Sequence, residues 1–326
     1  MRQTLGIRLS GVRLVMLTLT GCGSGDGAAS NKDVKILLVL NQMDSFRGTL
    51  VAAARDTAAA EGAQFDFKDA EGSIENQVNY LKSAQKEGYD VILCSPVSAE
   101  TVVELKASAG DIPIVFINSC PDEKQLKEGK YIYAGSDEFV AGQFQAEYVL
   151  NALAGSQEIN VVLLKGERAH SATDGRTKGV KQTLESSGKT INYVFEDYAD
   201  WDQDLARHLF EVFLKTGSPV DCVLCENDSM ALGVIEACKE AGIALNTLPV
   251  LGVDATADGC AAIKNGEMAF TVCQSGVGQG EAAVKAAIRF AQGESIDSLA
   301  GVSEDGKYVW VPFEKVDSTN VSQYSN

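Results

Sequence analysis

The sequence has little proline and few basic residues, and each shortage excludes a class of protein. Of its 326 residues only 6 are proline, while 45% are hydrophobic and 22% are charged. This composition is that of a folded globular protein, which excludes an intrinsically disordered or a collagen-like chain. Lysine and arginine number 28 against 45 aspartates and glutamates, a formal net charge of −17. Because a nucleic-acid partner requires a basic surface, we expect no nucleic-acid partner.

The first 32 residues differ in character from the rest of the chain. Three arginines precede the apolar run 14–19, which is too short to span a bilayer. A basic start, a short apolar run and small residues are typical of an export signal, with a buried N-terminal helix or strand as the alternative. Leu19-Thr20-Gly21-Cys22 resembles the bacterial lipobox. We therefore expect a signal peptide over 1–21, a lipid on Cys22 that anchors the protein outside the bacterial cell membrane, and a flexible tether over 22–32.

The remaining cysteines do not form a recognisable framework. Seven follow Cys22, an odd and irregularly spaced set. Cys222-Val223-Leu224-Cys225 has the C-x-x-C spacing of redox and zinc sites, but it lies in an expected strand, where residues three apart point to opposite faces. No second C-x-x-C and no neighbouring histidine completes a zinc site. An Asp/Asn-rich calcium loop is not visible around Ala154–Asn160 either. We expect buried free thiols, no metal and no cofactor.

Short apolar runs alternate with helical stretches along the rest of the chain. The expected strands are 34–40, 64–69, 90–94, 112–117, 131–134, 160–164, 193–196, 222–225, 249–253 and 270–273. The expected helices are 48–61, 74–87, 99–109, 139–153, 175–187, 203–215, 229–241, 256–265 and 277–293. Strands separated by helices predict β-α-β units and parallel sheets covered on both faces. Because the length exceeds what one core supports, this pattern predicts an α/β fold of two doubly wound parallel-sheet lobes.

Polar and aromatic side chains gather just after the expected strands. In open parallel sheets ligands bind beyond the carboxyl ends of the strands, so two facing lobes would share a cleft there. Carboxylates, amides and an arginine at these ends can bond sugar hydroxyls, and aromatic rings can cover the apolar face of a pyranose. The candidates are Asp44, Phe46, Asn118, His170, Arg176, Trp201, Asn227, Asp254 and Gln274.

Several of these residues also have plainer interpretations. Asp228, more readily than Asn227, would serve as the N-cap of the helix that starts there. A lone His170 would sit in a surface loop, and Phe46 and Trp201 would each fill a core. Their common position at one expected edge favours the binding site.

The residues 227–233, Asn-Asp-Ser-Met-Ala-Leu-Gly, and 252–254, Gly-Val-Asp, resemble signatures of bacterial periplasmic (type I) sugar-binding proteins of the ribose/galactose type. Asp44-Ser45-Phe46 and the six-residue spacing of His170 and Arg176 are similar to those of the glucose/galactose binders. The resemblance implies a monomer that captures a hexose and delivers it to an ABC permease. It also implies a three-segment hinge, with 33–136 plus 275–302 in one lobe and 137–274 plus 303–326 in the other.

Two residues depart from the glucose/galactose pattern. Ala172 stands where those binders carry an aspartate, and Gln274 replaces an asparagine. The sugar class is therefore better indicated than the sugar, because unpaired polar groups in a site discriminate strongly.

Three other functions remain open from the sequence. A glycoside hydrolase would use Asp44 and Asp254 as its two carboxylates. A ligand-sensing regulator would need a helix-turn-helix, whose place the export signal occupies. A lipoprotein that presents ligand to a chemoreceptor or sensor kinase would share every feature named above. We expect a binding protein and not an enzyme.

Overall fold

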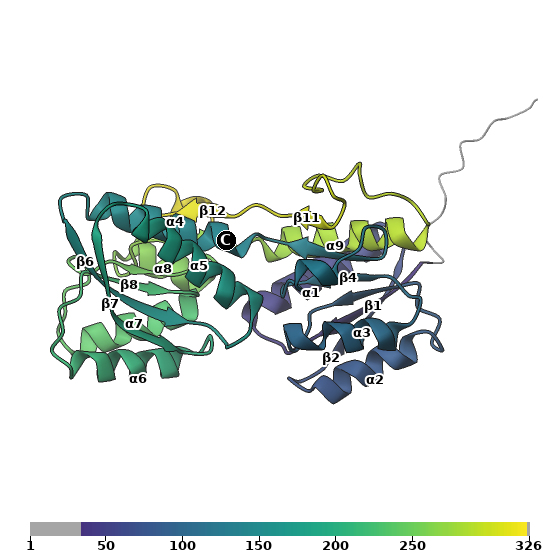
Figure 1. Ribbon diagram of the computed structural model, residues 1–326, viewed down its shortest axis with the longest axis horizontal. Helices are drawn as coiled ribbons and strands as arrows, with labels where there is room; N and C mark the ends of the chain where they lie inside the picture. Colours follow the sequence, from purple (N-terminus) through teal and green to yellow (C-terminus); the bar gives the residue numbers. More distant parts are fainter. Residues whose placement is uncertain (1–33, 325–326) are drawn as a thin grey trace, which may run out of the picture. The chain divides into compact units, whose positions relative to one another are not determined.

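The computed structural model describes residues 34–324 and has two parallel sheets, each covered by helices on both faces (Figure 1). The expected signal peptide, the lipid on Cys22 and the tether lie outside the described residues. The two-lobed, doubly wound α/β architecture predicted from the sequence is confirmed. Within the described part of the chain, no helix is long and apolar enough to cross a membrane.

The first lobe is built on a six-stranded parallel sheet in the order β11-β5-β4-β3-β1-β2. Its strands are β1 (Lys35–Leu40), β2 (Gln64–Asp69), β3 (Val91–Cys94), β4 (Ile114–Ile117), β5 (Tyr131–Gly135) and β11 (Tyr308–Trp310). Helices α1 (Ser45–Ala60) and α9 (Gly276–Ala291) cover one face, and α2 (Ile74–Ala84) and α3 (Val102–Ala109) cover the other (Figure 1). The central strands β3 and β4 are buried at every residue, as a sheet covered on both faces requires.

The second lobe has a four-stranded parallel sheet in the order β7-β6-β8-β9. Its strands are β6 (Glu158–Lys165), β7 (Thr190–Tyr198), β8 (Cys222–Cys225) and β9 (Val250–Leu251). Next to β9, β10 (Thr271–Cys273) pairs antiparallel with β12 (Glu314–Val316). Helices α4 (Glu138–Ala152) and α5 (Ser171–Glu185) pack on one face. The other face is covered by α6 (Gln203–Leu214), α7 (Asp228–Glu240) and α8 (Ala257–Lys264).

The chain passes between the lobes after β5, after β10 and after β11. The expected lobe boundary at Val302 is wrong, because β11 pairs parallel with β5 through Tyr308–Tyr133 and Trp310–Gly135. Residues 303–310 therefore belong to the first lobe, and the third crossing follows Trp310. A ring contact reinforces the pairing, since Trp310 of β11 meets Tyr133 of β5 edge-on with ring centroids 6.0 Å apart.

Helices α4 and α5 approach so closely that a glycine is required between them. A Cβ at Gly142 would lie 2.0 Å from the backbone oxygen of Arg176. This contact sets α5 directly against α4. It brings the first turn of α4 within reach of the Arg176 side chain.

The Lys189 side chain stabilises the corner where the chain passes from α4 to β6. Its ammonium donates to the backbone oxygens of Leu153 (3.4 Å), Ala154 (3.0 Å) and Ser156. Carbonyls at the end of a helix lack intrahelical partners, and a cation there also interacts favourably with the helix dipole. The lysine therefore satisfies several oxygens of one corner at once.

The seven cysteines in the described residues form no disulfide with one another. Five of them are buried, as expected, while Cys120 and Cys273 are half-buried. The C-x-x-C pair lies in β8, where burial raises the pKa of the Cys222 thiol and keeps it protonated. This environment is unsuited to redox or metal chemistry.

Candidate functional site

All nine candidate residues line one cavity between the lobes, at the carboxyl ends of the strands. The cavity has a volume of about 40 Å³, and Arg47 and Ala172 complete its lining. A second cavity of about 210 Å³ adjoins it and shares Asp44, Phe46, Arg47, Trp201, Asn227 and Asp254. A larger groove of about 630 Å³ lies elsewhere, beside α9, but it is mainly apolar and its Lys285 and Glu281 pair with each other at 3.1 Å. The inter-lobe cavity combines convergent polar groups with aromatic rings from both lobes.

The backbone around this cavity is strained. Asn118, Trp201 and Asp254 have φ angles of 58°, 64° and 115°. Asp200 and Ala255 beside them, and Ala169 beside His170, also have positive φ. Among the described non-glycine residues only Glu71 has one elsewhere. Each such conformation costs about 1–3 kcal/mol, and strain of this kind gathers at functional sites.

The first lobe presents a joined Asp44–Arg47 pair to the cavity. Asp44 is the N-cap of α1, and its Oδ1 accepts from the Arg47 backbone N–H at 2.7 Å. Helix α1 therefore begins three residues earlier than expected, because a side-chain cap and not the apolar pattern sets its start. The Arg47 guanidinium is only 4% exposed and donates to Asp44 Oδ2 at 2.6 Å and to Asn118 Oδ1 at 3.0 Å. Sequence reasoning missed Arg47, although a basic residue three positions after a candidate carboxylate was a signal.

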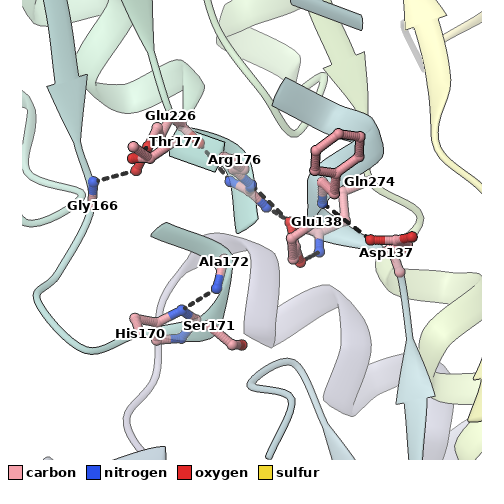
Figure 2. Close-up of polar contacts among 12 residues, drawn as sticks. Asp137, Glu138, Gly166, His170, Ser171, Ala172, Arg176, Thr177, Glu226 and Gln274 are labelled. Atoms are coloured by element: carbon pink, nitrogen blue, oxygen red, sulfur yellow. Dashed lines mark hydrogen bonds and ion pairs between the residues drawn. The ribbon is translucent and has the colours of Figure 1, made fainter. Parts of the chain in front are cut away.

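In the second lobe Arg176 is held by protein groups on several sides (Figure 2). Its Nε donates to Glu138 Oε2 at 2.8 Å, its Nη1 to the Glu226 backbone oxygen and its Nη2 to Gln274 Oε1 at 3.2 Å. Burial raises the pKa of Glu138, and the Arg176 charge opposes that shift. Glu138 was missed because only the folded chain places it under the cavity.

Gln274 lines the cavity but its amide is already engaged at both ends. Its oxygen accepts from Arg176, and its nitrogen donates to Glu138 Oε1 at 3.2 Å. The geometry thus gives Gln274 a part in orienting Arg176. One further N–H on its nitrogen remains for a ligand.

His170 is the N-cap of α5, which begins at Ser171, four residues earlier than expected. Its Nδ1 accepts from the Ala172 backbone N–H at 3.2 Å. Burial, helped by the charges of Arg47 and Arg176, lowers the pKa of His170 to about 3, so the ring is neutral. With Nδ1 accepting, the proton resides on Nε2, which is buried and has no partner among the described residues. The plainer interpretation as a surface loop residue is wrong, since the side chain is a buried donor at the cavity.

Trp201 lies against the backbone of Gly166. A Cβ at Gly166 would fall 2.0 Å from Cη2 of the indole, so only glycine allows this position. The ring meets His170 edge-on, with centroids 5.6 Å apart, and its Nε1 is another buried donor without a partner in the described chain. Phe46, from the opposite lobe, lines the same two cavities.

Asn227, and not Asp228, caps helix α7. Its Oδ1 accepts from the Met230 backbone N–H at 2.9 Å, and its amide nitrogen donates to the Trp201 backbone oxygen at 3.4 Å. One further N–H on that nitrogen remains for a ligand. Asp228 is fully buried and supports the loop beyond it, accepting from Thr271 Oγ1 at 2.6 Å and the Thr256 backbone N–H at 2.8 Å. Burial raises the pKa of Asp228 to about 6.

Asp254 is the least satisfied acceptor of the site. No hydrogen bond to its carboxylate is found within the described residues. Burial raises its pKa well above the ordinary value, against the opposing charge of Arg176. A ligand with hydroxyl donors would satisfy this carboxylate. No cluster of three or more His, Cys, Asp or Glu in residues 34–324 has the arrangement to hold a metal ion.

Comparison with known proteins places this cleft in a family. A model described as the periplasmic binding protein domain matches residues 36–295. The chain is 29% identical over 290 residues to a protein of Rhizobium meliloti named for rhizopine binding, covering 88% of this chain and 87% of that one. It is 31% identical over 273 residues to the D-galactose/methyl-galactoside binding periplasmic protein of Haemophilus influenzae, covering 79% and 80%. An ABC transporter solute binding protein from Bacillus halodurans with bound myo-inositol superposes with a TM-score of 0.78 at 29% identity, covering 91% and 98%. The chain therefore belongs to the periplasmic binding protein family.

Proposed function

We propose that this protein is an extracytoplasmic solute-binding lipoprotein that captures a monosaccharide and delivers it to an ABC permease. A glucose- or galactose-like hexose is the first candidate. The observation that carries the proposal is the cavity itself, in which both lobes supply hydrogen-bonding groups and one aromatic ring each. The galactoside-binding relative and the inositol-bound structure have ligands of this size and polarity.

In this proposal the second lobe supplies both acceptors and donors to the ligand. Asp254 accepts from ligand hydroxyls, and Asn227 and the Nε2–H of His170 donate to ligand oxygens. Phe46 and Trp201 cover the apolar faces of a sugar ring. A ligand that touches both lobes stabilises their closed arrangement only by the difference in its affinity for the open and closed states.

The arrangement of Asp44 opposes the hydrolase alternative. Both carboxylate oxygens of Asp44 are engaged by Arg47, one through the side chain and one through the backbone. A glycosidase needs two carboxyl groups free to exchange protons or attack the sugar. Asp44 is instead arranged as a fixed acceptor.

A thermal shift assay of the purified protein with D-glucose, D-galactose, D-xylose, D-ribose, D-fructose and myo-inositol tests the proposal. A ligand at a hundredfold excess over its dissociation constant stabilises the folded state by about 2.7 kcal/mol. Trp201→Ala and Asp254→Asn should abolish the shift, while Asp258→Asn, which removes an exposed carboxylate outside the cavity, should retain it. No shift with any of the six compounds would overturn the monosaccharide assignment.

A further inference from the structure

Two hydrogen bonds join the lobes directly across the cleft, and in both the acceptor lies within residues 166–171. Gln42 Nε2 in the first lobe donates to Glu167 Oε1 at 3.2 Å. The Cys120 backbone N–H, also in the first lobe, donates to Ser171 Oγ at 2.8 Å. Between these two contacts His170 lines the cavity. We call residues 166–171 the clasp loop, because its contacts hold the lobes together beside the ligand position.

The clasp loop is tied to the second lobe by one buried carboxylate, that of Glu226. This residue follows β8 and has no exposed surface. Its Oε2 accepts from the Gly166 backbone N–H at 2.8 Å, and its Oε1 contacts Thr177 Oγ1 at 2.5 Å (Figure 2). Its backbone oxygen accepts from Arg176. One residue thus connects the start of the clasp loop to helix α5.

We propose that Glu226 is a positioning residue for ligand binding, which holds the clasp loop in the shape that lets Glu167 and Ser171 reach the first lobe. Glu226 does not line either part of the inter-lobe cavity, so it acts through the loop and not on the ligand. The part of the proposal that concerns ligand affinity rests on the proposed function. The part that concerns the loop does not.

The bonding pattern dictates which substitution preserves the clasp. The Thr177 hydroxyl can donate or accept, so it bonds either an ionised or a protonated carboxyl group. A glutamine keeps an acceptor for Gly166 and offers a donor to Thr177. An alanine leaves the buried Gly166 N–H without its acceptor, a state that proteins avoid. Glu226→Gln should therefore retain the function that Glu226→Ala loses.

Hydrogen–deuterium exchange of the purified protein without ligand tests the loop directly. We expect Glu226→Ala to speed amide exchange in residues 166–171 about tenfold and Glu226→Gln to leave it within about twofold of the original. Asp228→Ala is the matched control, because it removes a neighbouring buried carboxylate that bonds Thr256 and Thr271 instead of the clasp loop. Equal acceleration by Glu226→Gln, or the same acceleration by Asp228→Ala, would overturn the proposal.

Thr177→Val is a milder variant for use if Glu226→Ala does not fold. It removes the bond between Glu226 and α5 at a half-buried position, and we expect about threefold faster exchange of the clasp loop. Exchange unchanged from the original chain would count against Glu226 as the anchor.

Calorimetry with D-galactose tests the link to affinity. We expect Glu226→Ala to weaken binding about tenfold, equivalent to about 1.4 kcal/mol. In a Gln42→Ala background the same substitution should cost less than about threefold, because one of the two contacts through which it acts is already lost. Independent, multiplying losses would refute action through the clasp. If the original chain does not bind D-galactose, galactose fails as the ligand, while the exchange experiment still decides the role of Glu226.

Discussion

Replacing Glu226 with glutamine should remove a large part of the pH dependence of stability. Burial raises the pKa of Glu226 from 4.5 to about 8, and the bonds from Thr177 and the Gly166 N–H only partly oppose it. In the unfolded chain the same group ionises near pH 4.3. Between these values the folded protein holds a proton that the unfolded chain has released, so the free energy of unfolding falls as the pH rises through this window.

The size of the effect follows from the two pKa values. Each unit of difference corresponds to about 1.4 kcal/mol, so the whole shift is worth on the order of 5 kcal/mol above pH 8. From pH 5.5 to pH 8.5 the part lost is about 3 kcal/mol. Because Glu226 is fully buried, solvent does not screen this contribution.

Urea unfolding at pH 5.5, 7.0 and 8.5 measures this pH-dependent loss in the free energy of unfolding. Repulsion among the many surface carboxylates also varies with pH, but it is common to the original chain and to Glu226→Gln. The original chain should therefore lose about 3 kcal/mol more than the variant across this range. A gap between the two proteins that stays constant within about 0.5 kcal/mol would refute the assignment of a raised pKa to Glu226.

Three further outcomes are expected. Gly166→Ala should weaken sugar binding by roughly a hundredfold in calorimetry, because its Cβ would displace the Trp201 ring. Gly155→Ala is the control, and it should bind normally because its Cβ meets nothing within 4 Å. Arg47→Met should lower the free energy of unfolding in urea by about 1 kcal/mol, because its partner carboxylate on Asp44 is partly solvated. The same variant should weaken sugar binding about tenfold, and unchanged affinity would exclude Arg47 from the site. Cys222 should react with a thiol reagent only when urea unfolds the protein, and reaction in the native state would show that β8 is accessible.

The fold and the location of the cavity were predictable because they depend on strong, local patterns. Buried parallel strands such as β3 and β4 are continuous apolar runs, and their carboxyl ends must meet at one edge. The same rule explains why residues chosen from seven separate strand ends line one cavity. What such a rule cannot supply is which of those side chains are free to meet a ligand. Gln274 shows the difference, since only the folded chain reveals that Arg176 and Glu138 already engage its amide.

The errors have physical causes of a different kind. The starts of α1 and α5 were placed too late because side-chain caps, Asp44 and His170, extend each helix beyond its apolar pattern. Strand β11 has three residues, which is too short for a periodic signal, and its place in the first lobe is set by pairing with a strand 175 positions earlier. Glu226 stands directly after β8, at a strand end like the candidates, but its role could not be predicted because it depends on tertiary burial.

The corner that the Lys189 ammonium stabilises, between α4 and β6, matters for the surroundings in which this protein works. A positive charge stabilises backbone oxygens that gather at the end of a helix, and here three of them accept from one ammonium. That charge is covalently attached, so its local concentration is fixed by the fold and not by the surrounding medium. The order of the corner is therefore independent of the supply of any dissolved ion. For a protein of an extracytoplasmic family, such a built-in counter-ion keeps one edge of the second lobe constant while the salts around it change.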